Sequence, residues 1–542
     1  MNTNIIKLSF SFFLVLLIFV IFGSTIFFKF YIIDDHHVVS LLGPDKYLGF
    51  EDFNKYINKI ILQIQGFYMR VILTHFWLPF ETIIFQDNPS FFYLSRIVII
   101  STFFVILFFF SSNLIGNYFS LILTTLFISS YSIADISTRI LTSEIVSIIA
   151  LIFLFPTIFK FIRLNNFHNY KINLTKIDIF IYFTFFNILI LSKESLTPFI
   201  IFTFAIVYLY LKKKIENSLF LIINLVIIFI FMLYCALVIG FVNKNLGLVS
   251  SGTLNGILDF DLKNCIRIIY KFSIYFFINY SIHILIFFYI FAKYKNTIKL
   301  SKFCVISSIS ILFIFSQFVI YNGNLPSHIR YDFVLDLLFY FNSLFFLFFL
   351  KKNNFYFYKF KITSIFLIFL LSLLISKISV LQSTYKNVQQ KKNDSIYFNQ
   401  TIKKIKKLSL ENSNLEILVT ATNVWDYEPI SSVYKFFKYE DIKNEIFLRL
   451  TFNKDDIKNK TELIFYNRLN DVSFQRDKLN EWSKHPNIDW GYSDLKKFNN
   501  SKKCIEIVIY GPLIQREIIK KIENRCDNFI NYFFPSKVND LL

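Results

Sequence analysis

The sequence predicts an α-helical polytopic membrane protein with a soluble α/β domain at its C-terminus. Its 542 residues are 55% hydrophobic and only 17% charged, with a mean hydropathy of +0.52. Soluble globular proteins carry about 25% charged residues. Apolar runs of membrane-spanning length recur as far as residue 380, and the pattern stops there. We therefore expect a transmembrane domain over residues 1–380 and a soluble domain over residues 381–542.

The apolar runs predict about eleven transmembrane helices, because about 20 apolar residues are needed to span the hydrocarbon core. The first run, residues 8–30, is too long for the apolar part of a signal peptide and has no small-residue cleavage site, so we expect it to be retained. The other runs lie near residues 91–111, 118–134, 140–162, 177–192, 196–211, 218–241, 271–292, 303–321, 333–350 and 362–380.

The lysine-rich loops predict the orientation, because short cytoplasmic loops carry an excess of basic residues. If the N-terminus is cytoplasmic, every lysine-rich short loop lies on that side, and an odd number of spans sends the tail outward. We therefore expect a multi-pass protein of the plasma (inner) membrane with an extracytoplasmic tail. The formal net charge of +20 then reflects topology and predicts no nucleic-acid partner. The loops in question fall within residues 160–176, 212–214, 293–302 and 351–361.

The first predicted outer loop, residues 31–90, is long. Residues 50–64 within it place apolar side chains at helical spacing opposite charged ones. This pattern predicts an amphipathic helix that lies in the plane of the lipid bilayer surface. In the tail, residues 415–420 and 504–510 are typical of strands, and residues 515–526 predict a helix.

An ionisable cluster, Asp34-Asp35-His36-His37, directly follows the first span. Charged groups at the edge of a bilayer are costly and are therefore candidates for function. Isolated charges also stand at or near the predicted outer ends of later spans. The chain has no P-loop, dinucleotide fingerprint or Gly-x-Ser-x-Gly motif. Its candidate functional groups are therefore carboxylates and cationic side chains beside lipid. Such groups suit a lipid-borne substrate that carries phosphate.

The acidic pair in a first outer loop with an interfacial helix resembles the GT-C superfamily of membrane glycosyltransferases, which includes protein mannosyltransferases and the lipid A aminoarabinose transferase. Three further stretches, all at outer ends of spans, are similar to what such enzymes carry there. The resemblance covers residues 1–380 and implies a GT-C-like fold. The three further stretches at outer ends of spans are Arg139-Ile-Leu-Thr-Ser-Glu144, Ser192-Lys193-Glu194 and Arg330-Tyr331.

The resemblance implies inverting transfer of a sugar from a polyprenyl-phosphate donor to an acceptor hydroxyl. The hydroxyl needs a base, which a carboxylate supplies, and the departing phosphate needs fixed positive charge. We expect Asp34 to be the general base and Asp35 to orient the acceptor, or the reverse. The alternative is that one of the two only caps a turn.

The remaining candidates bind donor or acceptor, and each has a structural alternative. Some relatives use a divalent cation at the acidic motif, with His36 and His37 as candidate ligands here, but adjacent histidines on a loop rarely form a site alone. We therefore predict no certain cofactor. Simple ion pairing and interfacial anchoring are the alternatives for the others. The candidates for binding are Arg70, Arg139, Glu144, Lys193, Glu194, Arg330 and Tyr331.

Three features stay open at this stage. Asp336 falls inside a span, where it is protonated, paired or facing a cavity. Residues 425–429 are a candidate acceptor loop, although an ordinary strand-to-helix connection is favoured. Cys504 and Cys526 can pair if the tail is in an oxidising compartment.

The expected partners are the bilayer, the donor lipid and an acceptor that is a glycolipid, a polysaccharide or a protein. The alternative function is transport of a lipid-linked saccharide. A transporter is expected to place polar or charged groups near mid-membrane and to show broken helices or inverted repeats. In this chain the charges gather at one interface, and the sequence shows no repeat.

Overall fold

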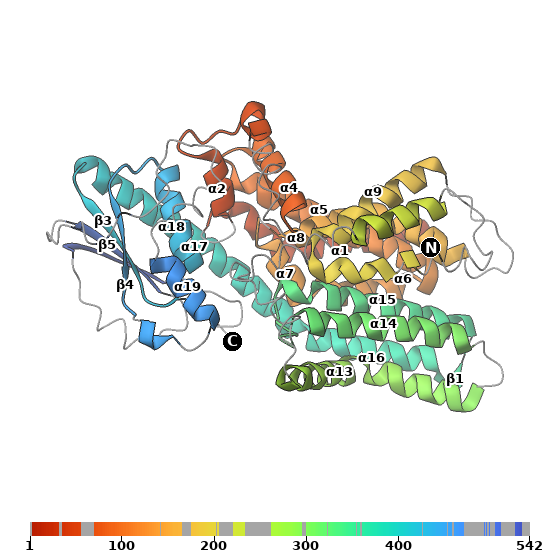
Figure 1. The fold of residues 1–542 in the computed structure, drawn as a ribbon. Coiled ribbons are helices and arrows are strands. Elements are labelled where there is room, and N and C mark those ends of the chain that lie inside the picture. Colours follow the sequence, from red (N-terminus) through yellow and green to blue (C-terminus); the bar gives the residue numbers. More distant parts are fainter. Residues whose placement is uncertain are drawn as a thin grey trace.

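The computed structural model is mostly helical, with a bundle of long apolar helices joined to a smaller α/β tail (Figure 1). Apart from gaps of one to three positions, it describes residues 3–55, 70–164, 175–207, 220–232, 262–294, 300–470 and, in pieces, 493–510 and 526–533.

The bundle begins with α1 (Thr3–Phe22) and the 3-10 turn η1 (Gly23–Phe27). The helices that follow are α2 (His36–Leu42), α4 (Arg70–Phe85), α5 (Pro89–Ile115), α6 (Asn117–Ile128), α7 (Tyr131–Ser137), α8 (Ser143–Leu164) and α9 (Lys176–Ser192). The second half contains η3 (Glu194–Phe199), α13 (Leu262–Tyr294), α14 (Leu300–Ile320), η4 (Arg330–Asp332), α15 (Phe333–Asn353), the short hairpin β1 (Tyr356–Phe357) and β2 (Phe360–Lys361), and α16 (Ile362–Ser376).

Several of these helices are long and apolar enough to cross a membrane, so the chain is a multi-pass membrane protein by length and composition. Among the described residues there are five such helices, or up to six if the bent pair α6 and α7 forms one span. Shorter apolar helices include Ser143–Thr157, Phe220–Met232 and Ser310–Ile320. Each of these falls on an apolar run that the sequence predicts to span the membrane.

Local sequence explains where the bundle helices start and stop. The side chain of Asn88 accepts a hydrogen bond from the backbone of Ser90 ahead of Pro89, which is a favourable N-cap for α5. Gly116 ends α5 with φ of +91°, a conformation that only glycine adopts without strain. Thr175 and Asp178 form a capping box at the start of α9.

The break between α6 and α7 bends the chain by 63°. It falls at Ser129-Ser130, and Ser129 donates its hydroxyl to the carbonyl of Thr125. Such back-bonding competes with the helical ladder and bends helices. The short α7 therefore leaves the direction of α6.

The tail starts as a continuation of the membrane helix. Helix α17 (Ile378–Glu411) follows α16 and runs through residue 380 without a break. The tail then contains β3 (Glu416–Ala421), α18 (Tyr427–Tyr439), β4 (Ile446–Leu450), η6 (Lys454–Asp456), α19 (Lys460–Asn470), β5 (Cys504–Tyr510) and β6 (Asn528–Phe533).

The four tail strands form a parallel sheet in the order β4-β3-β5-β6. Both strands predicted from the sequence are therefore confirmed; the predicted helix over 515–526 falls almost wholly outside the described residues. One sheet face packs toward α17 and α18. On the other face, Arg449 pairs with the buried Glu506 (3.0 Å), which also accepts a bond from Thr420 (2.5 Å).

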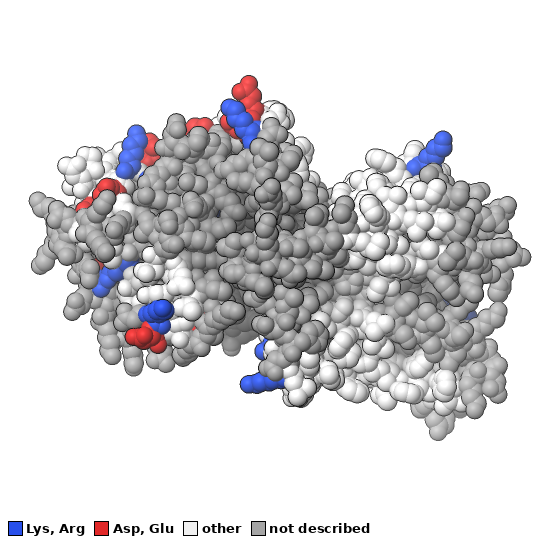
Figure 2. Space-filling model, viewed as in Figure 1, with Lys and Arg blue, Asp and Glu red and all other residues white. Residues whose placement is uncertain are grey.

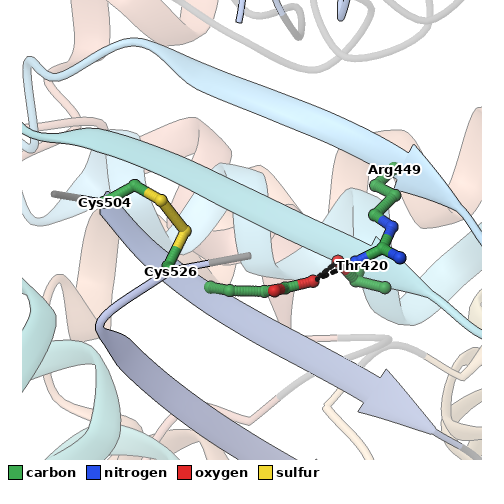
Figure 3. Close-up of a disulfide and its surroundings, with 5 residues drawn as sticks. Thr420, Arg449, Cys504 and Cys526 are labelled. Carbon is green, nitrogen blue, oxygen red and sulfur yellow. Dashed lines mark hydrogen bonds and ion pairs between the residues drawn. A yellow bond between two sulfur atoms is a disulfide. The ribbon is translucent and has the colours of Figure 1, made fainter. Parts of the chain in front are cut away.

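A disulfide joins Cys504 at the start of β5 to Cys526 just before β6, with the two Cα atoms 4.9 Å apart (Figure 3). The pairing that the sequence left open is therefore present. It closes the connection between two neighbouring strands.

Charge is distributed unevenly over this fold. In the view of Figure 2, the described surface of the bundle is almost entirely uncharged, whereas most of the charged side chains in view lie toward the tail. One hydrophobic core nevertheless continues from the bundle into the tail, and α2 packs on α18. The N-terminus and β1 lie at the end of the bundle away from the tail (Figure 1).

Candidate functional site

Several charges predicted from distant parts of the sequence meet where the tail joins the bundle. We call the set the ionic cluster. It combines four cationic side chains with two carboxylates and a tyrosine ring. Its members are Asp135, Arg139, Glu144, Lys193, Arg330, Tyr331 and Lys391.

Asp135 on α7 is the centre of one half of the ionic cluster, and its side chain is buried. Its Oδ1 accepts a hydrogen bond from Arg139 Nε (2.8 Å) and lies 4.0 Å from Lys391 Nζ. Its Oδ2 accepts from the backbone N–H of Arg330 (3.3 Å). Three segments far apart in sequence are therefore held around one carboxylate.

Glu144 and Lys193 form the other half. Lys193, directly after α9, forms an ion pair with Glu144 in the first turn of α8, and both side chains are buried. The ammonium of Lys193 also lies 4.8 Å from the centre of the Tyr331 ring. The guanidinium of Arg330 lies 5.6 Å from the same ring. Tyr331 therefore links the two halves through cation–π contacts.

The sequence predicted the convergence but not the pairing. Arg139 lies in the connection between α7 and α8, whereas Glu144 lies in the first turn of α8. Each of the two binds a different partner. Helix α7 ends at Ser137, ahead of Arg139, and α8 begins only at Ser143, so Arg139 and Glu144 lie on different segments.

Asp35 lies at the start of α2 and is buried. Its Oδ2 accepts hydrogen bonds from the Tyr31 backbone N–H (2.9 Å) and from the hydroxyl of Tyr93 on α5 (2.8 Å). The carboxylate is thus held by the backbone of Tyr31, four residues earlier in the chain, and by the side chain of Tyr93. This contact matches the alternative role of a turn-closing carboxylate for Asp35.

The two histidines of the motif pack against each other, with ring centroids 4.1 Å apart. His36 is buried, and its Nδ1 lies 2.5 Å from the hydroxyl of Ser432 on α18. Because that nitrogen is used in a contact to the tail, His36 ties α2 to α18. Within the described residues, no group of three or more His, Cys, Asp or Glu side chains is arranged to hold a metal ion.

Helix α17 brings the acidic motif and the ionic cluster into one neighbourhood. Ser395 accepts from the backbone of Lys29 (3.2 Å), and Asn399 donates to the carbonyl of Phe30 (2.7 Å). One turn earlier, Lys391 donates to Thr138 (2.9 Å) beside Asp135. These three residues are spaced by four on one helix face, so the contacts to Lys29 and Phe30 lie about 6–12 Å along α17 from the contact to Thr138.

Three predicted site residues have positions or side chains outside the described residues. Asp34 falls in the gap at residues 32–34. The side chains of Arg70 and Glu194 are not described, although their backbones begin α4 and η3.

Two further carboxylates have partners within the bundle. Asp336 accepts a hydrogen bond from Ser132 (2.5 Å), so it has a partner within the bundle. Glu81 forms a buried, bidentate pair with Arg96, with nitrogen–oxygen distances of 2.5 and 2.6 Å. Arg96 also donates to the carbonyl of Ile140. This pair fixes α4 against α5.

Sequence reasoning missed Asp135, Lys391 and Tyr93 as site residues. The spacing of Asp135 and Arg139 by four residues was a usable signal, because such a pair faces the same side of a helix. Lys391 belongs to an ordinary lysine-rich amphipathic helix, and nothing in the sequence distinguishes it.

No protein-family model, curated protein or solved structure matches this chain. The arrangement of its own residues is therefore the basis for a functional proposal.

Proposed function

We propose that this chain is an integral membrane glycosyltransferase of the GT-C type. It transfers a sugar from a polyprenyl-phosphate donor to an acceptor hydroxyl at the extracytoplasmic end of the bundle, with inversion. The observation that carries the proposal is the ionic cluster. Its cationic side chains outnumber its carboxylates, and two of them, Arg139 and Lys391, are 23% and 24% exposed.

The reaction explains why such a cluster is useful. The acceptor oxygen attacks the anomeric carbon, the bond from that carbon to the phosphate oxygen breaks, and the hydroxyl proton passes to a carboxylate. The departing polyprenyl phosphate gains one negative charge as the bond breaks. Fixed cations that face this growing charge stabilise the transition state more than the ground state.

The acidic motif supplies the base in this proposal. Asp35 is already bonded to Tyr31 and Tyr93, which favours a positioning role for it and leaves Asp34 as the base. Helix α17 contacts both Phe30, shortly before this motif, and Thr138 beside the ionic cluster, which is compatible with a base and a phosphate site that act on one substrate.

The disulfide in the tail supports the proposed orientation. Disulfides persist in oxidising compartments and are rare in the cytosol. A tail outside the cytoplasm places the ionic cluster, which lies where the tail joins the bundle, at the same face. At the other end, Lys7 donates to Asn113 (2.6 Å), and a basic residue at that end agrees with a cytoplasmic N-terminus.

The test is a transfer assay on the purified protein in lipid nanodiscs. Polyprenyl phosphates that carry labelled hexoses or pentoses serve as donors, and membranes from a deletion strain supply the acceptor. We expect Asp34→Asn to lower the rate by about 100-fold or more, because general-base catalysis contributes about 10²–10⁴-fold. Glu51→Gln is the control, since Glu51 is an exposed carboxylate in the same loop.

Two results would contradict the proposal. One is absence of transfer from every polyprenyl-linked sugar. The other is full activity in both Asp34→Asn and Asp35→Asn, which would remove the acidic motif from the mechanism.

A further inference from the structure

We propose that the tail completes the donor site, with Lys391 of α17 contacting the phosphate of the polyprenyl carrier. This inference rests on the proposed function and adds a residue from outside the transmembrane domain. It gives the tail a direct part in substrate binding.

The position of Lys391 supports a role in binding anions. Its ammonium donates to the hydroxyl of Thr138 (2.9 Å) and lies 4.0 Å from Asp135 Oδ1. The backbone of Arg330 and the side chain of Arg139 meet the same carboxylate. One carboxylate therefore brings together two cationic side chains and the backbone of Arg330. A phosphate with several oxygens can bridge cationic side chains in such an arrangement.

Partial exposure makes this cluster accessible. The side chain of Lys391 is 24% exposed and that of Arg139 is 23% exposed, whereas Asp135 is 2% exposed. The carboxylate is therefore beneath the cations, and the cations form the outer surface of the site. An arriving phosphate meets positive charge first.

The same helix face that carries Lys391 also positions the segment before the acidic motif. Ser395 and Asn399 bind the backbones of Lys29 and Phe30. The ring of Phe398 packs edge-on against Tyr31, with centroids 6.0 Å apart. Movement of α17 would therefore shift the segment before the acidic motif and the phosphate contact together, so Ser395 and Asn399 are positioning residues.

The first experiment measures binding of undecaprenyl phosphate to the purified full-length protein, with undecaprenol as the neutral lipid for comparison. We expect Lys391→Gln to weaken binding of the phosphate by about tenfold or more and to leave binding of undecaprenol unchanged. Lys391→Arg keeps the charge and should retain most of the affinity. Lys386→Gln on the same helix is the matched control, because Lys386 is exposed.

A second comparison separates a binding role from a merely structural one. Lys391→Gln alone removes a cation from buried Asp135 and can disturb the fold. Asp135→Asn/Lys391→Gln removes both charges, and it should bind undecaprenyl phosphate about tenfold less tightly than Asp135→Asn alone. Equal affinities of these two variants would overturn the inference.

The outcomes also separate this inference from the proposed function. If undecaprenyl phosphate binds in a Lys391-dependent way but no sugar is transferred, the phosphate site is supported and the proposed transferase function is wrong. Transfer with unchanged phosphate binding in Lys391→Gln would sustain the transferase and refute the role of Lys391.

Discussion

Two ionic arrangements in this protein use similar residues and differ in design. Arg96 and Glu81 form a bidentate pair with side chains 1% and 3% exposed, and their charges balance. In the ionic cluster, cations outnumber carboxylates, and Arg139 and Lys391 are partly exposed. A balanced, fully buried pair fixes two helices, whereas an excess of exposed cations is available to an anionic ligand.

The strongest test of this comparison is Arg96→Met. It leaves Glu81 as a buried carboxylate without its bidentate partner, so we expect it to lower the free energy of unfolding by about 3–5 kcal/mol. Thermal unfolding in detergent measures the effect. Arg96→Met/Glu81→Met should recover much of the loss, because no charge is left stranded. A single variant as stable as the wild type would show that the pair does not stabilise the bundle.

Lys193 sharpens the comparison because it has features of both arrangements. It forms a buried pair with Glu144 and also faces Tyr331 in the ionic cluster. We expect Lys193→Met to lower both stability and transfer activity. In Lys193→Met/Glu144→Gln, thermal unfolding should return toward the wild-type temperature while activity stays low. Recovery of activity along with stability would make this pair purely structural.

Arg330 tests the exposed half of the ionic cluster. Arg330→Gln should lower kcat/KM for the donor by about 10- to 100-fold, because a charge-assisted contact is worth about 1.5–3 kcal/mol. Its unfolding temperature should change little, since a partly exposed charge contributes at most about 1 kcal/mol to stability. Arg267→Gln is the control, as Arg267 is an exposed arginine near the start of α13. A large fall in stability with unchanged kcat/KM would show that Arg330 stabilises the fold and does not bind the donor.

The smallest expected effect concerns the contact between the first loop and the tail. Glu440 accepts from Lys46 (2.9 Å) and Lys406 (3.1 Å). Burial raises the pKa of Glu440, but the two ammonium groups outweigh it, and its pKa lies below the usual 4.5. The ionised form is thus favoured in the folded protein, and the stability it contributes is present above about pH 4.5 and is lost as the pH falls through the lowered pKa.

We therefore expect Glu440→Gln to lower the unfolding temperature slightly at pH 7 and to converge with the wild type in acid. Thermal unfolding across pH measures this. Glu411→Gln, at an exposed ion pair with Lys407, is the control. A difference that grows in acid would contradict the sign of the shift.

Much of the architecture could be predicted from the sequence, because it depends on local patterns. Where the structure describes them, apolar runs such as 91–111 and 271–292 lie on helices, and the strand patterns at 415–420 and 504–510 became β3 and β5. The number of spans is harder to predict. The apolar runs suggest about eleven, whereas among the described residues five or six helices meet the length and hydropathy requirement. A helix bent between α6 and α7 divides an apolar run that the sequence presents as continuous.

The sequence by itself determined that this is a multi-pass membrane protein and which charges stand at the ends of its helices. Only the tertiary structure decided which of those charges meet. Asp135 contacts Arg139, Arg330 and Lys391, which come from segments up to about 250 residues apart. A buried carboxylate requires such compensating partners. Those partners depend on how α7, η4 and α17 pack, and no local pattern in the chain encodes that packing.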